Sequence, residues 1–423
     1  MHLLRKSGSD SVKEVDDFKD PGPPPDGGAK AWTQAVMGHL AAFLCWGYLT
    51  SFGAFQAYYQ SDLLADKSPS DISWIGSFQV FMIFFVGAFS GRALDAGYFR
   101  PVYITGCFLL IFGVFMVSIC KTYWQVFLAQ AVCSGLGSGL LFTPAIGLVS
   151  TYFSHKRTFA LAFFLCGSGT GGMVLPAVVS ELLGKIGFGW TMRVVGFILL
   201  AVSAVTVALF RTRLPPRKTG PLVDWAAFNE TTFVLYIVGM FFNFFALYFA
   251  FYYLSSYGRS RLGLSYKDAV HLLIVVNGVG IPGRLIPAWI SDRYIGPINT
   301  MIPSCFISAL LLYCWAAIKA ESGLYAFAIL YGLFANGVQG LWPGGLASLT
   351  HDLSKTGTRM GMGFTIVSLA LLTGPPIGGA LISRDDGQYL YAQMWSGSSF
   401  VIGACFLLVA RFSKTRFEFR SKV

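Results

Sequence analysis

The stretch "RTRLPPRKTGPLVDWAAFNET", residues 211–231, is the longest polar interruption inside a strongly apolar chain of 423 residues. It is basic at its start and contains Pro215, Pro216 and Pro221, which disfavour a continuous helix. Six long apolar runs precede this segment, and six follow it. The segment therefore predicts a linker between two halves of similar size.

The apolar runs have the length that a bilayer requires. Hydrophobic residues make up 55% of the chain and charged residues only 12%, about half the share of a soluble protein. A run of about 20 apolar residues spans the hydrocarbon core as a helix. We identify twelve such runs: 31–59, 71–94, 99–119, 122–152, 158–183, 190–210, 232–257, 267–291, 297–318, 323–350, 360–382 and 388–411. They are continuous rather than alternating, so the sequence predicts an all-α membrane protein with twelve transmembrane helices.

The predicted organisation follows from these runs. The start of the chain is polar and Pro-rich and lacks the apolar core of a signal peptide, which predicts a disordered tail. We expect a cytoplasmic tail over 1–28, a first six-helix bundle over 29–211, a cytoplasmic linker over 212–231, a second bundle over 232–411 and a short cytoplasmic tail over 412–423.

The basic residues are concentrated in the segments on one side of the membrane and do not form a patch that would bind nucleic acid. If the amino terminus is cytoplasmic, 21 of the 31 Lys and Arg residues fall in cytoplasmic segments and nine on the opposite side. The remaining one, Arg284, lies inside a run. This bias predicts that both termini are cytoplasmic. We expect the lipid bilayer and a small-molecule substrate as partners and no nucleic acid, and the sequence identifies no accessory protein.

The chemistry of an enzyme or a metal site is not indicated. The eight cysteines lie in or beside the apolar runs without a CxxC pair, so we interpret them as packing residues. We find no nucleophile paired with a base, no metal cluster and no phosphate-binding loop in a soluble context. We therefore expect neither enzyme activity nor a cofactor.

The two halves share landmarks at a nearly constant offset. Three pairs are 199 residues apart and one is 197 apart: Pro144 with Pro343, Lys156 with Lys355, Pro176 with Pro375, and Asp95 with Asp292. Four matches at equivalent places indicate two pseudo-symmetric six-helix halves.

A chain of two parallel six-helix repeats resembles the major facilitator superfamily of transporters, from about residue 25 to the end. Such repeats offer two packings of similar energy around a site at the midplane, which permits alternating access. The loop "GRALDAGYFRP", residues 91–101, is similar to a superfamily motif between the second and third spans. The resemblance implies a gating role for Asp95 and Arg100, and for Asp292 and Arg293 in the second half. These charges could instead only cap helices and follow the positive-inside bias.

Two further stretches resemble the monocarboxylate-transporter-like family, and its fungal branch in particular. "PPPDGGAKAW", residues 23–32, is similar to the family's sequence before the first span. The segment from Gly135 to Pro176 is similar to its signature around the fourth and fifth spans.

In that family an arginine of the eighth span binds the substrate's carboxylate, and the resemblance assigns this role to Arg284. A planar, permanently charged fork suits a carboxylate. Arg284 could instead bond backbone carbonyls or snorkel to the cytoplasmic face. The family's proton-coupled members carry an Asp one turn earlier, where this chain has Gly280, and a lysine in the first span, where it has only His39. We therefore expect facilitated transport rather than obligatory proton coupling.

Polar and amphipathic residues within the runs are further candidates for the substrate site, because polar groups in lipid need partners. They are Asn243, Tyr248, Tyr252, Asn277, Asn336, Gln339 and Trp342. Helix–helix hydrogen bonding is the alternative for each of them. The glycines of "GSGTGG", residues 167–172, are expected to serve close packing or bending of a helix.

Together these observations predict a secondary transporter that moves a small organic anion or a carboxylate-bearing metabolite by alternating access. An exporter of a fungal secondary metabolite is the first alternative, and a nutrient sensor that does not transport is the second. We expect the plasma membrane as its location, with the vacuolar membrane as the alternative.

Overall fold

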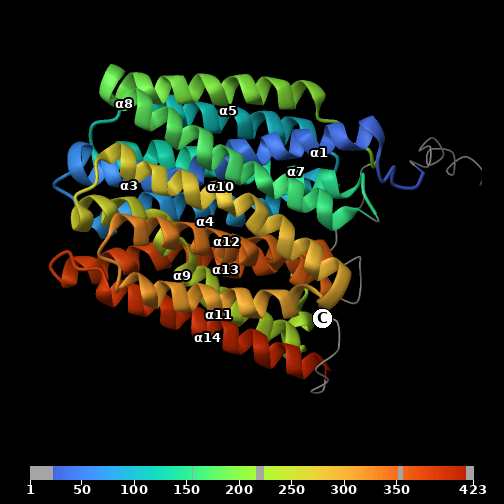
Figure 1. Ribbon diagram of the computed structural model, residues 1–423. Helices are drawn as coiled ribbons and strands as arrows, with labels where there is room; N and C mark the ends of the chain where they lie inside the picture. The colour runs from blue at the N-terminus through green and yellow to red at the C-terminus, as the bar shows by residue number, and fades with distance from the viewer. Residues whose placement is uncertain (1–21, 155, 216–222, 351–355, 416–423) are drawn as a thin grey trace, which may run out of the picture.

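The computed structural model describes residues 22–154, 156–215, 223–350 and 356–415, and every regular element within them is helical. Long apolar helices lie side by side. The first and last described residues, and the described residues on either side of the linker, lie at one end of the bundle, here called the linker end (Figure 1). The opposite end is called the distal end. This arrangement confirms the predicted all-α membrane architecture.

The first half begins with one apolar segment, Gly28–Leu63, that contains two π-helical turns. It consists of α1 (Gly28–Ala42), η1 (Phe43–Gly47), α2 (Tyr48–Thr50), α3 (Phe52–Tyr58) and η2 (Tyr59–Leu63). The helices that follow are α4 (Pro69–Asp95), α5 (Phe99–Val117), α6 (Tyr123–Val126), η3 (Phe127–Ser134), α7 (Gly135–Ser150) and α8 (Arg157–Leu209).

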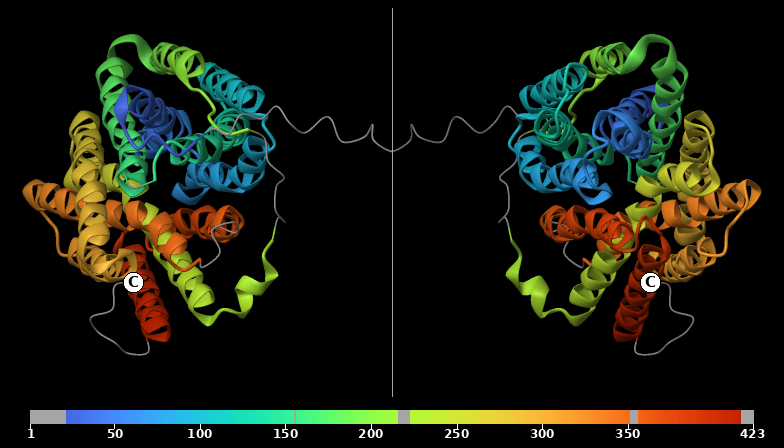
Figure 2. Two further views of the ribbon diagram at one scale, coloured as in Figure 1. Left: turned by 90° about the vertical axis from the view of Figure 1, so that its right-hand side faces the viewer. Right: turned by 90° about the vertical axis from the view of Figure 1, so that its left-hand side faces the viewer.

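The second half follows a short 3₁₀ helix, η4 (Trp225–Asn229). Its helices are α9 (Thr231–Leu262), α10 (Tyr266–Ile290), η5 (Ser291–Ile295), α11 (Pro297–Trp315), α12 (Glu321–Ser348), α13 (Thr356–Arg384) and α14 (Leu390–Thr415). Seen along the helices, the two halves form two separate groups, blue to green and yellow to red (Figure 2). They meet where α10 packs along α8, α13 along α4, and α9 against α3.

Helix α8 contains two membrane crossings. Its 53 residues would measure about 80 Å as a straight helix, more than twice the hydrocarbon thickness of a bilayer. The helix breaks at Gly187, whose φ of 71° is a backbone conformation that glycine adopts without strain. The break separates the predicted runs 158–183 and 190–210. The eleven long apolar helices of the described residues therefore supply twelve crossings.

Polar caps set the distal starts of two helices. Ser68 begins α4 with a capping box, in which its side chain accepts from Asp71 N and Asp71 in turn accepts from Ser68 N. Ser265 caps α10 by a single bond, in which its side chain accepts from Asp268 N. Each cap satisfies orphan N–H groups at a helix end.

Glycines let α8 lie between α1 and α10 at very short range. A Cβ atom added at Gly167 would overlap the carbonyl oxygen of His39, and one added at Gly171 would lie 2.5 Å from the Cα atom of Gly47 on the same partner segment. On the other face of α8, Gly169 and Gly172 lie against Asn277 of α10. The expectation that the "GSGTGG" glycines serve close packing is confirmed.

We expect Gly167→Ala to destabilise the folded protein by about 1–3 kcal/mol, because the added methyl group forces α1 and α8 apart. The matched control is Gly184→Ala in the same helix, where no atom lies within 4 Å of the added Cβ. The control should be neutral or slightly stabilising, since alanine favours helix over glycine. The measurement is the thermal unfolding midpoint of the purified protein in detergent, and equal midpoints for both variants would contradict this packing.

Candidate functional site

The guanidinium of Arg284 lies inside the protein, away from the surrounding lipid. It projects from α10 and is only 2% exposed. Its Nη1 donates to the carbonyl oxygen of Gly280 at 3.3 Å, and its Nη2 donates to Gln339 Oε1 of α12 at 3.3 Å. Within the described residues no carboxylate pairs with this charge. These two bonds use two of the five N–H donors that a guanidinium offers.

Three helices of the second half bring a polar group to this point. Tyr248 of α9 donates from its hydroxyl to Gln339 Oε1 at 3.5 Å, so that oxygen faces both Tyr248 and Arg284. The Nε2 of Gln339 is buried and has no partner among the described residues. The group formed by Arg284, Gln339 and Tyr248, called the arginine site below, is therefore rich in donors and poor in acceptors.

Tyr252 and Asn277 extend this group toward the first half. The ring of Tyr252 lies 6.1 Å from that of Tyr248 and 4.8 Å from that of Phe52 in the other half. Its buried hydroxyl has no partner among the described residues. Asn277 donates to Leu273 O within α10, and its unpartnered Oδ1 lies at the junction of α10, α8 and α2.

The other predicted site residues lie in helix packing contacts. Asn243 donates to Gly239 O and packs on Gly403 of α14. Asn336 donates to Gly332 O at 2.7 Å and, more weakly, to Val276 O at 3.4 Å. Packing explains the burial of both amides without a ligand, and their predicted role in binding stays a prediction.

Trp342 belongs to an aromatic cluster near the linker end. Its ring stacks on Tyr236 at 5.9 Å and lies 5.6 Å from Phe364. Phe364 in turn contacts Phe84 of the first half at 4.9 Å. None of its hydrogen-bond or ring contacts within the described residues reaches Arg284, although its indole N–H is buried and has no partner there.

The space beside Gly280, one turn before Arg284, is occupied by the side-chain amide of Asn336 from α12. A Cβ atom added there would lie 2.5 Å from Nδ2 of Asn336. A larger side chain at 280 therefore requires Asn336 to move. The carbonyl of Gly280 meanwhile accepts from Arg284, so this residue positions the guanidinium through its backbone.

The two halves are joined at the distal end by hydrogen bonds that sequence reasoning missed. Ser70 of α4 donates to Pro376 O at 2.9 Å, and Tyr253 of α9 donates to Pro69 O at 3.1 Å. Arg259 of α9 donates to Ala57 O at 3.0 Å. Most acceptors are main-chain carbonyls, which leave no recognisable residue pattern in the sequence. An ion pair between Lys267 and Glu181 adds a contact between α10 and α8.

At the linker end a small cleft of about 170 Å³ lies between α8 of the first half and the second half. It is lined by Phe159 of α8 and by Ala288, Trp289, Asp292 and Arg293 of the second half. The guanidinium of Arg293 lies over the rings of Trp289 and Tyr294, at 5.7 and 5.8 Å. Two of the four predicted gating residues therefore face the boundary between the halves.

The other two predicted gating residues lie where α4 meets α5. Asp95 is half-buried at the end of α4, and Arg100 is exposed in the first turn of α5. The gating role of all four residues stays a prediction.

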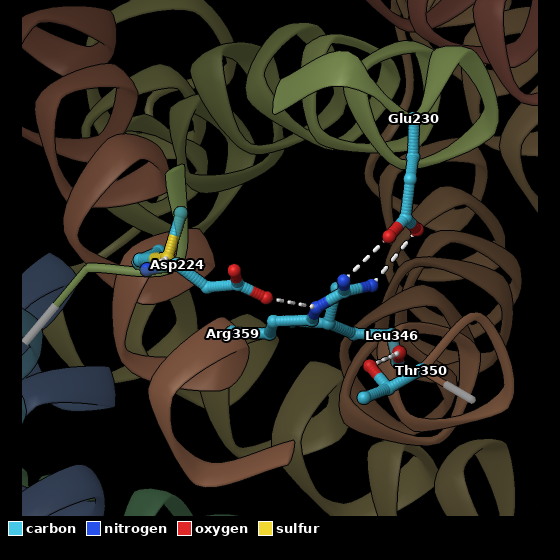
Figure 3. Close-up of polar contacts among 6 residues, drawn as sticks. Asp224, Glu230, Leu346, Thr350 and Arg359 are labelled. Carbon is cyan, nitrogen blue, oxygen red and sulfur yellow. Dashed lines mark hydrogen bonds and ion pairs between the residues drawn. The ribbon is translucent and has the colours of Figure 1, made fainter. Parts of the chain in front are cut away.

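A buried charge cluster attaches the end of the linker to α13, as Figure 3 shows. Arg359 is 5% exposed and donates from Nε to Asp224 Oδ2 at 3.0 Å. Its two terminal nitrogens bind both carboxylate oxygens of Glu230, at 2.8 and 2.5 Å. No local sequence pattern indicates this cluster, because its partners are 135 and 129 residues apart.

We expect Arg359→Met to lower the stability of the protein by about 3 kcal/mol, because the substitution leaves the buried Asp224 carboxylate without its cation. Arg359→Lys should recover part of this loss, since an ammonium keeps the charge but cannot bind in the same bidentate way. Arg384→Met is the control, an exposed arginine at the other end of the same helix. Thermal unfolding in detergent measures all three, and a neutral Arg359→Met would show that the cluster does not stabilise the fold.

Comparison with known proteins identifies a family over most of the chain. Residues 36–351 match the family described as Major Facilitator Superfamily. An MFS-type transporter of Gibberella zeae is 43% identical over 399 residues, which cover 94% of this chain and 90% of the relative.

Two relatives from Emericella nidulans are similar over comparable lengths. The MFS-type transporter dbaD is 39% identical over 387 residues, covering 92% of this chain and 86% of the relative. The aspyridones efflux protein apdF is 35% identical over 405 residues, covering 95% and 82%.

Proposed function

Because this chain belongs to the major facilitator superfamily of membrane transporters, we propose that it exports an acidic organic metabolite whose negative charge binds Arg284. The observation that carries this proposal is the buried guanidinium of Arg284, which meets an amide oxygen and a backbone carbonyl but no carboxylate of the described residues. A buried charge without a counter-ion is costly. A ligand that supplies the missing negative charge would remove that cost.

The neighbours of Arg284 support a ligand with several acceptor groups. The unused guanidinium donors, Gln339 Nε2 and the Tyr252 hydroxyl can all donate, and the latter two are buried without a protein partner. Carboxylates and acidic enols present two oxygens to such donors in a planar arrangement. Charge-assisted hydrogen bonds of this kind are about twice as strong as neutral ones.

Export is supported by the arrangement of the two ends and by one relative. The halves are hydrogen-bonded to each other at the distal end, and a small cleft lies between them at the linker end. If the linker end faces the cytoplasm, this cleft opens toward the compartment in which metabolites are made. A relative that is 35% identical is named as an efflux protein for aspyridones.

The closer relationship to the monocarboxylate-transporter-like family is part of this proposal. Asp26, in the segment that resembles the family's sequence before the first span, accepts from Ser154 N at 2.5 Å and from Lys156 N at 3.4 Å. These hydrogen bonds join segment 23–32 to the segment from Gly135 to Pro176, the two stretches that resemble the family. Their contact supports the idea that the two stretches act together in the fold.

We further propose that the protein lies in the plasma membrane with both termini in the cytoplasm. The described residues next to the basic linker and next to the chain ends lie at one end of the bundle, as the positive-inside bias requires (Figure 1). A tag at the carboxyl terminus should resist protease added outside intact cells and become sensitive after the membrane is permeabilised. Cleavage in intact cells would show that the termini lie outside the cell, and the cleft at the linker end would then open to the outside as well.

We expect Arg284→Gln to abolish export while abundance and membrane insertion are retained. Loss of a buried, hydrogen-bonded charge pair costs about 2–5 kcal/mol, which predicts at least a ~30-fold weaker interaction with an anion. The measurement is a comparison of acidic metabolites inside and outside producing cells that carry the parent or the variant. Arg284→Lys, which keeps the charge and loses the planar fork, should give an intermediate loss.

Arg261→Gln is the matched control, because Arg261 is exposed at the distal end of α9. It should export like the parent. Unchanged export by Arg284→Gln would remove the anchoring role. An external metabolite profile that does not depend on the protein at all would favour a sensor that binds without transporting.

A further inference from the structure

His39 of α1 makes a hydrogen-bonded contact with α8 through both of its ring nitrogens. Nδ1 lies 3.0 Å from the carbonyl oxygen of Phe163, and Nε2 lies 3.0 Å from Thr170 Oγ1. The ring also lies 4.9 Å from the ring of Phe163. His39 is partly buried rather than enclosed, so its ring can exchange protons with water.

The donors and acceptors at this contact are compatible with two protonation states. The carbonyl of Phe163 can only accept, so Nδ1 carries a hydrogen in both states. Thr170 Oγ1 also lies 3.0 Å from Gly167 O. When Nε2 is protonated it donates to Thr170 Oγ1, whose own hydrogen goes to Gly167 O. When Nε2 is neutral, the Thr170 hydroxyl turns and donates to Nε2 instead.

The two states therefore differ by one proton on Nε2 and by rotation of one hydroxyl group, and no covalent bond other than the N–H is formed or broken. Both states keep His39 fully hydrogen-bonded. Histidine is also the side chain whose unperturbed charge change falls between pH 5 and 8. A small change in surroundings can thus move the ring from one state to the other.

The charged groups around His39 are basic and lie mainly toward the linker end. They are Lys30 on α1 itself, Arg157 at the start of α8, Arg211 after the end of α8, and Arg284 beyond α8 on α10. Helix α7, which also packs against α1, carries no charged residue. The remaining charged residues of α8 lie on either side of its break at Gly187, toward the distal end. They are Glu181, Lys185 and Arg193. No ion pair joins His39 in the described part of the chain, so a proton there is held by hydrogen bonds alone.

Helix α8 connects this contact to the arginine site. Thr170 lies between Gly169, which faces α10, and Gly171, which faces Gly47 in the segment of α1. A Cβ atom at Gly169 would lie 3.6 Å from Arg284 Nη1 and 3.0 Å from Asn277 O. Close-packed interiors transmit displacement rather than absorb it. Thr170 therefore lies where a change in its contact with α1 is passed on to the boundary between α8 and α10.

We propose that His39 is a proton-binding site that sets the balance between the two packings of the halves. Protonation strengthens the α1–α8 contact by adding a charged donor to Thr170, and deprotonation releases Gly167 O. The shift passes through α8 to its boundary with α10. The proposal goes beyond the transported substrate and does not depend on whether Arg284 binds an anion.

The experiment follows the distance between the halves at the distal end as the pH is changed. Spin labels are attached to Ala65→Cys and Gln388→Cys, two exposed distal positions, with the exposed Cys314 and Cys405 replaced by serine. The protein is held in lipid nanodiscs, and the distance distribution is measured by pulsed electron spin resonance from pH 5 to 8. The parent should shift between two distributions over this range, and His39→Gln should lose the shift.

The matched control is His271→Gln, a second histidine within an apolar helix that lies on α10 and outside this contact. It should shift like the parent. Arg284→Gln should also keep the shift, so a failed substrate site and a failed proton site are distinguished. A parent distribution that does not change with pH, or a shift that persists in His39→Gln, would overturn the proposal.

Thr170→Val provides a second variant if His39→Gln does not fold. Valine has nearly the same shape as threonine but neither donates to nor accepts from Nε2. The pH midpoint of the shift should move, because both protonation states lose a hydrogen bond and the charged state loses the stronger one. An unchanged midpoint in Thr170→Val would contradict the part assigned to that hydroxyl.

Discussion

A permanently charged guanidinium inside a bundle of apolar helices constrains the rest of this molecule. Arg284 cannot lose its proton, and the described residues offer it only neutral oxygen atoms. The helices around it must therefore keep lipid away while leaving donors for something that enters from water. The carbonyl of Gly280 and the amide oxygen of Gln339 meet this requirement, because each accepts from the guanidinium without neutralising it, and the Tyr248 hydroxyl donates to the same Gln339 oxygen.

The same region depends on how closely three helices approach one another. Glycines on both faces of α8 place the backbones of α1, α8 and α10 in contact, so the two halves of the protein share a boundary that cannot be loosened locally. Such a boundary favours movement of each half as a unit. Contacts at the distal end, made mostly to main-chain carbonyls, can open in one step because water can replace each of them.

Much of the fold could be predicted from the sequence, because bilayer thickness dictates the length of every run and duplication repeats the landmarks. Arg284 could be identified because a charge inside an apolar run is conspicuous. The faces of the helices could not be predicted, since runs that are apolar on all sides carry no periodic pattern. Asn243 and Asn336 therefore looked like Asn277 in sequence, although the first two pack inside the second half and Asn277 lies at its boundary with the first half. The cluster of Arg359 and the contacts of His39 depend on pairs more than 120 residues apart.

The attachment of Asp224 and Glu230 to Arg359 shortens the tether between the two bundles. Eight peptide units connect Pro215 to Val223, and such a length of chain spans at most about 28 Å when fully extended. Without the attachment the connection would extend to the start of α9, and its greatest span would grow to roughly 55 Å. Arg359 thus sets an upper limit on how far the two bundles can move apart at the linker end.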